Sequence, residues 1–258
     1  MKKIIKSVSN AFLAPLNLEL VGKQKQEKIL SNYHHSMPKC EERLKHARSI
    51  GFTPKIIVDA GAYVGSWTYT TASIFPEAQF IVIEPNPHVE KKIDNTLQDL
   101  KGRTTIIGKA VADQPGTLPF NIWGDPNDAT SASLQNHVRG SAENTVNVEV
   151  DTIDNVLTEY SRHADLVKLD LQGAELKALR GATETLKTAE MFIVEFGCLE
   201  AYIDRATPQQ LMEIFYGNDY CLYDIVDCHY RPYDGAMTGG DFFFIKNDSP
   251  LRKYKGWN

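Results

Sequence analysis

An acid and two glycines in the stretch KIIVDAGAYVGS, residues 55–66, are suited to hold a small ligand. An apolar run ends on Asp59, and Gly61 and Gly65 then bracket a short turn before Ser66 begins an amphipathic stretch. This order predicts a buried parallel strand that delivers an acid into a glycine turn, where a ligand approaches the backbone and the next helix. An ordinary strand-to-helix turn with incidental glycines is the alternative interpretation.

The glycine spacing and the charge of this turn favour one class of ligand. Gly61 and Gly65 are four residues apart and do not form the G-x-G-x-x-G fingerprint of dinucleotide-binding turns. The acid Asp59 also suits a cationic ligand better than a pyrophosphate. S-adenosyl-L-methionine carries a positive amino group and a positive sulfonium, and so we predict it as the cofactor in preference to NAD.

A second acid stands where an adenosine ligand needs one. Residues 79–84, QFIVIE, predict a second buried strand that ends on Glu84, nineteen residues after Gly65. This spacing is close to the interval at which an acid reaches the ribose hydroxyls of a nucleotide held at the first turn. Asn86, in the strand-breaking segment that follows, is a further predicted contact.

A third strand is predicted over residues 104–111 and is followed by Ala112 and Asp113. In a doubly wound sheet this end lies beside the first two, so Asp113 is placed to contact the adenine amino group. A turn-capping role for Asp113 is the alternative, because a Gln-Pro-Gly turn follows it. The predicted cofactor contacts are Asp59, Gly61, Ala62, Tyr63, Gly65, Glu84, Asn86, Ala112, Asp113 and Asp170.

Charged side chains also stand at the ends of the later strands. Lys168 and Asp170 face the same side of a fourth predicted strand, residues 165–171. Charges near the end of a central strand are costly unless they serve a ligand or pair with a neighbour, and structural pairing of Lys168 is the alternative interpretation. Glu195 ends a fifth strand, and His229 lies in a predicted glycine-rich loop between the last two strands.

Strand and helix signals alternate from residue 55 onward, which predicts βαβ units and a parallel sheet. A helix is predicted at 66–75, and apolar residues at helical spacing predict another between residues 89 and 100. The last two of seven strands, Tyr220–Val226 and Asp241–Lys246, are joined without a helix pattern. They are therefore predicted to be antiparallel neighbours.

The chain divides into two predicted parts. Residues 1–53 carry helical spacing in pieces and predict an N-terminal extension that packs on the core or forms a lid over it. Residues 54–258 form the α/β domain, whose rhythm lapses at about 117–150. There we predict a β insertion, a hairpin or meander, at the C-terminal rim of the sheet, where insertions shape substrate pockets.

The composition limits the possible partners and surroundings. The chain has 258 residues, 42% of them hydrophobic, and a net charge of −5 without a clustered basic face, which argues against a nucleic-acid partner. No apolar run is long enough to span a membrane, and we expect a cytoplasmic protein. The four cysteines form no C-x-x-C pair and are expected to be reduced.

Several motifs together resemble the FkbM family of S-adenosylmethionine-dependent methyltransferases. They are VDAGAYVG, IEPNP, KAVAD, VKLDLQGAELKALRGA and IVEF, in order over roughly residues 55–197. The resemblance implies a class I methyltransferase (Rossmann-like) fold, a doubly wound seven-stranded sheet with its last strand antiparallel. It also implies O-methylation of a hydroxyl on a sugar, glycolipid or small-molecule natural product.

The resemblance has limits that depend on particular residues. The family pattern usually has Val-Glu before the glycine that matches Gly173, whereas Leu171 and Gln172 stand there in this chain. A role that needs a charge at this position is therefore not carried over to Gln172. The first 53 and the last 50 residues lie outside the match, so the acceptor, a small molecule or a glycan, is not identified.

The chemistry of a methyl transfer decides among the candidate catalytic residues. An alcohol is a weak acid, so a base or a divalent cation beside its oxygen assists the transfer. We expect Asp170 to be the base, ahead of Glu195 and His229. Asp170 with Glu195 is also the one pair that we can propose for a divalent cation, and no dedicated metal site is predicted. His34 and His35 lack a ligand partner and predict a solvated pair.

Two other functions remain open on the sequence. One is an NAD-type Rossmann oxidoreductase, which the glycine spacing disfavours. The other is a non-catalytic module that binds S-adenosylmethionine on the same fold. The sequence makes no prediction about the oligomeric state.

Overall fold

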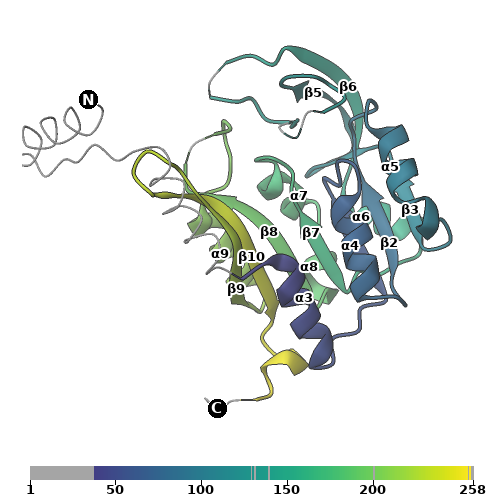
Figure 1. Cartoon of the computed structure of the whole chain (residues 1–258), viewed down its shortest axis with the longest axis vertical. Helices are drawn as coiled ribbons and strands as arrows, with labels where there is room; N and C mark the ends of the chain where they lie inside the picture. The colour runs from purple at the N-terminus through teal and green to yellow at the C-terminus, as the bar shows by residue number, and fades with distance from the viewer. Residues whose placement is uncertain are drawn as a thin grey trace, which may run out of the picture.

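The computed structural model describes residues 38–254 and 256, except for residues 129, 131, 139 and 200. Helices cover both faces of a seven-stranded sheet, and a second, three-stranded sheet lies at the top of the view in Figure 1. Most of the predicted N-terminal extension, including His34 and His35, lies outside the described residues. Within the described ranges, no helix has the length and apolar character needed to cross a membrane.

The large sheet has the strand order of a doubly wound fold with a reversed strand near one edge. Its order is β3-β2-β1-β7-β8-β10-β9, in which the first five strands are parallel and β10 is antiparallel to both neighbours. The strands are β3 (Thr104–Ile107), β2 (Gln79–Ile83), β1 (Ile56–Ala60), β7 (Leu166–Leu169), β8 (Met191–Gly197), β10 (Met237–Lys246) and β9 (Tyr220–Tyr230). This confirms the prediction of seven strands with antiparallel last neighbours, and places β1 beside β7 at the point where the strand order reverses.

Two hydrophobic cores sandwich the sheet because successive strand residues point to opposite faces. On β1, Ile57 packs into one core and Val58 into the other. The first core includes residues of α3 (Cys40–Ser49), α4 (Ser66–Ile74) and α5 (Glu90–Thr96). The second includes residues of α6 (Ile153–Glu159), α7 (Glu175–Arg180), α8 (Thr185–Thr188) and α9 (Pro208–Gly217). Two short 3-10 helices, η2 (Gln98–Leu100) and η3 (Pro250–Arg252), complete the described elements.

Helix α3 is the described part of the predicted N-terminal extension, and it is attached to β9. The backbone N–H of Cys40 donates to the carboxylate of Asp227 at 2.9 Å, and the ammonium of Lys39 lies 3.1 Å from the same carboxylate. Arg43 forms a further ion pair with Asp224. The helix therefore packs on the antiparallel edge of the sheet.

The predicted third strand, residues 104–111, is wrong as a single element. Strand β3 ends at Ile107, the chain bends at residues 108–109, and β4 (Ala110–Val111) pairs with a different sheet. The reason is that Ala110 packs into a separate apolar cluster with residues of β5 and β6, whereas Val111 packs into the second core of the large sheet. In addition, Lys109 forms ion pairs with two acids of β6, which hold the chain away from β2.

The second sheet contains the segment predicted to be inserted. Its order is β4-β6-β5, with β5 (Gly116–Ile122) antiparallel to β6 (Asn144–Asp151). Between these strands, Ser133 forms a bridge with Asn121 and donates its hydroxyl to the carbonyl of Gln172 at 2.8 Å. The chain between β5 and β6 is therefore fixed against the turn that follows β7.

Candidate active site

A cavity of about 230 Å³ lies where the large sheet meets the second sheet. Its walls come from the residues at the C-terminal ends of β1, β2 and β7, from the chain after β3, and from β5 with the loop that follows it. The lining residues are Gly61, Tyr63, Ile83, Glu84, Pro85, Lys109, Ala110, Val111, Phe120, Thr130, Ala132, Leu134, Asp170, Leu171, Gln172 and Ala174. Ligands of doubly wound sheets bind at this edge.

The turn after β1 requires a glycine because its backbone lies close to the backbone at the end of β7. Gly61 has a φ of +85°, and a Cβ on it would lie 1.8 Å from the carbonyl oxygen of Asp170. No other residue fits there, so the glycine lets the ends of β1 and β7 meet. Gly65 has a φ of +80° and is the N-cap of α4, where a Cβ would press on the side chain of Leu97.

Glu84 is held rigidly at the end of β2, at the edge of the cavity. Its two carboxylate oxygens accept the backbone N–H groups of Tyr63 at 2.8 Å and of Asn86 at 2.9 Å. Burial raises the pKa of Glu84 to about 7 against the effect of these two hydrogen bonds, and the charges of Asp59 and Asp170 raise it further. Each oxygen retains a lone pair for a ligand hydroxyl.

Asp59 lies behind the cavity and does not line it. Its carboxylate is fully buried, and one oxygen accepts the hydroxyl of Thr68 at 2.6 Å while the other has no hydrogen-bond partner. Burial raises the pKa of Asp59, and the charge of Lys168 and the bond from Thr68 oppose this rise. Its predicted contact with the cofactor remains a prediction.

The other predicted cofactor contacts are divided between the cavity wall and its support. Tyr63 lines the cavity, with a φ of +50°, whereas Ala62 and Gly65 lie outside the lining. The side chain of Asn86 is buried and donates to the carbonyl of Pro126 at 3.1 Å, which ties the turn after β2 to the insertion.

The residues that follow the mispredicted third strand are also outside the cavity lining. Ala112 is buried, and its N–H donates to the carbonyl of Asp151 at 2.9 Å. Asp113 is exposed. The cavity wall is instead formed by Lys109, Ala110 and Val111, just before them.

Asp170 reaches the cavity from the end of β7 and is paired with Lys168. The ammonium of Lys168 lies 3.0 Å from one carboxylate oxygen of Asp170, and the amide of Gln172 donates to the other at 2.9 Å. Burial opposes ionisation of Asp170, but the charge of Lys168 and these two hydrogen bonds outweigh it and lower its pKa. Lys168 is therefore paired, as the alternative interpretation has it, and Asp170 lines the cavity all the same.

Glu195 stands beside Asp170, and its pKa is shifted in the opposite direction. Burial and the charges of Asp170 and Glu175 raise its pKa well above its ordinary value, although Arg205 lies 3.2 Å away and opposes the rise. The amide of Gln172 donates to Glu195 as well, at 3.3 Å. Gln172 thus connects two carboxyl groups whose pKa values are shifted in opposite directions.

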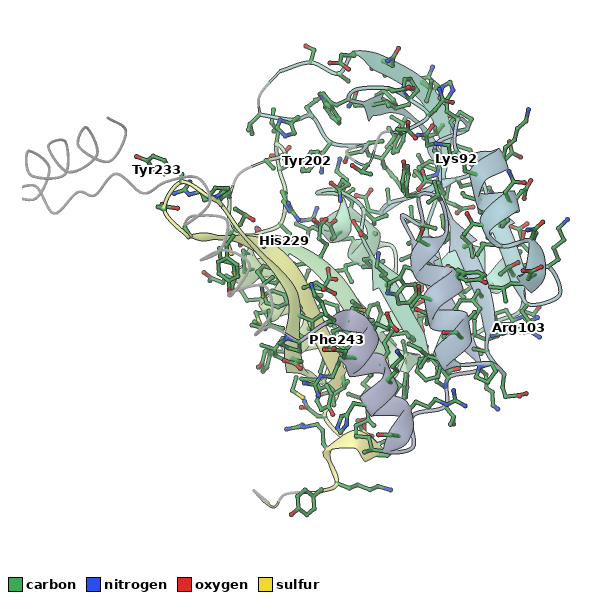
Figure 2. All side chains as sticks on the ribbon, in the orientation of Figure 1. Lys92, Arg103, Tyr202, His229, Tyr233 and Phe243 are labelled. Carbon is green, nitrogen blue, oxygen red and sulfur yellow. The ribbon has the colours of Figure 1, made fainter. Side chains whose placement is uncertain are left out.

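His229 does not join these residues. The prediction that it lies in a loop is wrong, because β9 and β10 extend further than the sequence indicates and His229 pairs with Gly239. Figure 2 labels His229 beside the ribbon of these two strands. Its side chain is exposed, and β10 separates its strand from the strand of Glu195. Among the described residues, no group of three or more His, Cys, Asp and Glu side chains could hold a metal ion.

Sequence reasoning misses several residues that line the cavity. Phe120 and Leu134 come from the insertion, and their apolar character at a sheet rim is the only signal that points to them. Gln172 departs from the family pattern, but its two acid partners depend on how β7 and β8 align.

The strand order and the acid-lined cavity at the C-terminal edge define a class I methyltransferase fold. A family model described as the methyltransferase FkbM domain matches residues 59–225, and the chain belongs to this family. The match includes the ends of β1, β2 and β7, which carry Gly61, Glu84 and Asp170.

Curated relatives and solved structures are similar to this chain. The chain is 24% identical over 171 residues to the 2-O-methyltransferase NoeI of Sinorhizobium fredii (strain NBRC 101917 / NGR234), an alignment that covers 62% of this chain and 70% of NoeI. It is 26% identical over 156 residues to the methyltransferase sdnD of Sordaria araneosa, an alignment that covers 50% of this chain and 60% of sdnD. Aeropyrum pernix fibrillarin, solved with natively bound S-adenosyl-L-methionine, is 12% identical with a TM-score of 0.44, covering 76% of this chain and 68% of fibrillarin.

The buried acids predict how stability depends on pH. Burial raises the pKa of Glu84 and of Asp241 to about 7, from ordinary values of 4.5 and 3.8. Between about pH 5 and pH 7 the folded chain therefore binds protons that the unfolded chain has released, and the free energy of unfolding falls as the pH rises. Urea denaturation at pH 5.5, 6.5 and 7.5 measures this slope.

Asp241→Asn is expected to reduce the slope, because it removes one of the acids whose pKa is raised to about 7. Asp99→Asn, at an exposed site on η2, is the matched control and should leave the slope unchanged. A free energy of unfolding that rises from pH 5.5 to pH 7.5 in the wild type contradicts the prediction.

Proposed function

We propose that the cavity binds S-adenosylmethionine and that the chain transfers its methyl group to a hydroxyl oxygen of a small-molecule or glycan acceptor. The observation that carries this proposal is the position of Asp170, an ionised carboxylate that lines the cavity opposite the fixed carboxylate of Glu84. Membership of the FkbM family and the similarity to a protein named as a 2-O-methyltransferase support it.

The cavity fits the chemical groups of this cofactor. Glu84 has free lone pairs at the edge of the cavity, and these can accept the two ribose hydroxyls. Val111, Phe120 and Leu134 give the cavity apolar walls for a flat purine ring. The negative charge of Asp170 suits a ligand that carries a sulfonium and an ammonium group.

Asp170 and its neighbours Lys168 and Glu195 can remove the proton from the hydroxyl group of the acceptor. S-adenosylmethionine, when bound, supplies an electrophilic methyl group. Asp170 is held ionised by Lys168, and it accepts the hydroxyl proton as the new carbon–oxygen bond forms and the hydroxyl becomes acidic. The raised pKa of Glu195 disfavours a second negative charge beside Asp170.

The insertion excludes water from this chemistry. Phe120, Ala132 and Leu134 close one side of the cavity, and the hydroxyl of Ser133 holds this segment on the turn after β7. A drier cavity strengthens the electrostatic contacts that Glu84 makes. We therefore propose that the insertion belongs to the cofactor site as well as to the acceptor side.

Replacing Glu84 tests the cofactor site. Glu84→Gln replaces one of the two carboxyl oxygens that can accept the ribose hydroxyls with an amide nitrogen that cannot, and we expect a loss of about 1–3 kcal/mol of binding free energy for S-adenosylmethionine. Isothermal titration calorimetry with S-adenosylmethionine, and separately with NAD, measures the effect. Glu90→Gln, at an exposed site on α5, is the matched control and should bind as the wild type does.

Unchanged affinity in Glu84→Gln, with an unchanged circular dichroism spectrum, removes Glu84 from the site. Tighter binding of NAD than of S-adenosylmethionine to the wild type contradicts the proposed function as a whole.

Replacing Asp170 tests the proposed base. Asp170→Asn keeps the shape and removes the charge, so we expect turnover to fall by roughly 10²–10⁴ while cofactor affinity stays within a few-fold. The measurement is transfer of a radiolabelled methyl group to a panel of hydroxyl-bearing sugars and small molecules, with Asp99→Asn as the control. Turnover equal to the wild type rules out Asp170 as the base, and an equal loss of cofactor affinity makes it a cofactor ligand instead.

A further inference from the structure

Gln172 forms hydrogen bonds, through its side chain and its backbone, with groups from four parts of the fold. Its amide nitrogen donates to Asp170 at 2.9 Å and to Glu195 at 3.3 Å, and its amide oxygen accepts the hydroxyl of Tyr202 at 3.0 Å. Its backbone carbonyl accepts the hydroxyl of Ser133 at 2.8 Å. The side-chain amide thus joins the end of β7, β8 and the loop after β8, and the backbone of the same residue is tied to the insertion.

These contacts determine which way the amide points. A glutamine amide has two N–H donors on nitrogen and an acceptor on oxygen. With the opposite orientation, the amide oxygen would face the ionised carboxylate of Asp170, and the nitrogen would face the hydroxyl of Tyr202. Both N–H donors are therefore directed at carboxyl groups, one at Asp170 and one at Glu195.

The backbone of Gln172 is held in an unfavourable conformation. Its φ is +52°, in the left-handed region that residues with a side chain rarely adopt, and the next residue, Gly173, has a φ of +100°. Such strain persists only where the surroundings fix it, and it concentrates at functional sites. The ring of Tyr202, which accounts for one of the fixing contacts, itself lies 5.2 Å from His137 and 6.1 Å from Trp123 of the insertion.

We propose that Gln172 is a positioning residue that bridges Asp170 and Glu195 with its two N–H donors and so holds the carboxylate of Asp170 directed into the cavity. The proposal rests on the proposed function, in which Asp170 accepts the acceptor proton. A carboxylate in place of this amide would provide no N–H donor and would place a third acid beside the other two.

The pKa shifts agree with this arrangement. The pKa of Asp170 is lowered although burial opposes this, and the hydrogen bond from Gln172 contributes to the lowering. The pKa of the buried Glu195 is raised, in part by the charge of Asp170. The other charged groups that act on this pair are Lys168 on β7, Asp59 on β1, Glu84 after β2, Glu175 on α7, Asp241 on β10 and Arg205 before α9.

Gln172→Glu tests the proposal without any acceptor. We expect the lower apparent pKa of the Asp170–Glu195 pair to rise by about one pH unit or more, because two N–H donors are lost and a negative charge is gained. Carboxyl-carbon NMR titration of the full chain measures it, with signals assigned from Asp170→Asn and Glu195→Gln. Gln210→Glu is the matched control, because a capping box accepts glutamate as readily as glutamine.

A second variant, Gln172→Asn, tests the same proposal if Gln172→Glu does not fold. Gln172→Asn keeps an amide and tolerates a left-handed backbone, but it is one methylene shorter and cannot reach both acids. It should show a smaller rise in the same pKa. Gln172→Asn should also lower kcat by about tenfold to a hundredfold, with the dissociation constant of S-adenosylhomocysteine within about threefold of the wild type.

The outcomes separate the two proposals. An unchanged titration of the pair in a folded Gln172→Glu overturns the positioning role, as does a loss of S-adenosylhomocysteine binding without a titration shift. A shift of the titration in a chain whose wild type binds no S-adenosylhomocysteine supports the positioning of Asp170 and overturns only the proposed function.

Discussion

The ion pair of Lys168 with Asp170 is the interaction on which the rest of the site depends. Lys168 is buried, and its ammonium lies 3.0 Å from Asp170 and 5.6 Å from the centre of the Trp67 ring. Burial disfavours its charge, but the carboxylates of Asp170, Asp59 and Asp241 outweigh that cost and raise its pKa. One buried cation therefore allows several acids to gather at the edge of the sheet.

The geometry of the sheet places these charges where a ligand can meet them. Parallel strands end at one edge, so Glu84 and Asp170 reach the same cavity from either side of Gly61. The ends of β1 and β7 approach so closely that only glycine fits at position 61. The insertion then covers the cavity and is fixed to the turn after β7 by Ser133. The position of the acids, the close approach of the two strand ends and the placement of the insertion therefore depend on the same few contacts.

The sequence predicts those parts of the site that depend on local order along the chain. An apolar run followed by an acid or glycine marks a strand end, and this rule alone identifies Gly61, Glu84 and Asp170 as residues at the C-terminal edge of the sheet. The rule fails where a strand boundary or a side-chain contact depends on segments that are distant in the sequence. The break after β3 depends on ion pairs of Lys109 with β6, and the two acid partners of Gln172 depend on the register of β7 with β8.

The structure of the chain in complex with S-adenosylhomocysteine tests the central claim most directly. We predict that the ligand lies in the cavity between the ends of β1, β2 and β7 and the second sheet. Its ribose hydroxyls should contact Glu84, and its sulfur should point toward Asp170. A ligand bound outside this cavity, or one whose sulfur lies away from Asp170 with the ribose on other residues, would contradict the proposed site.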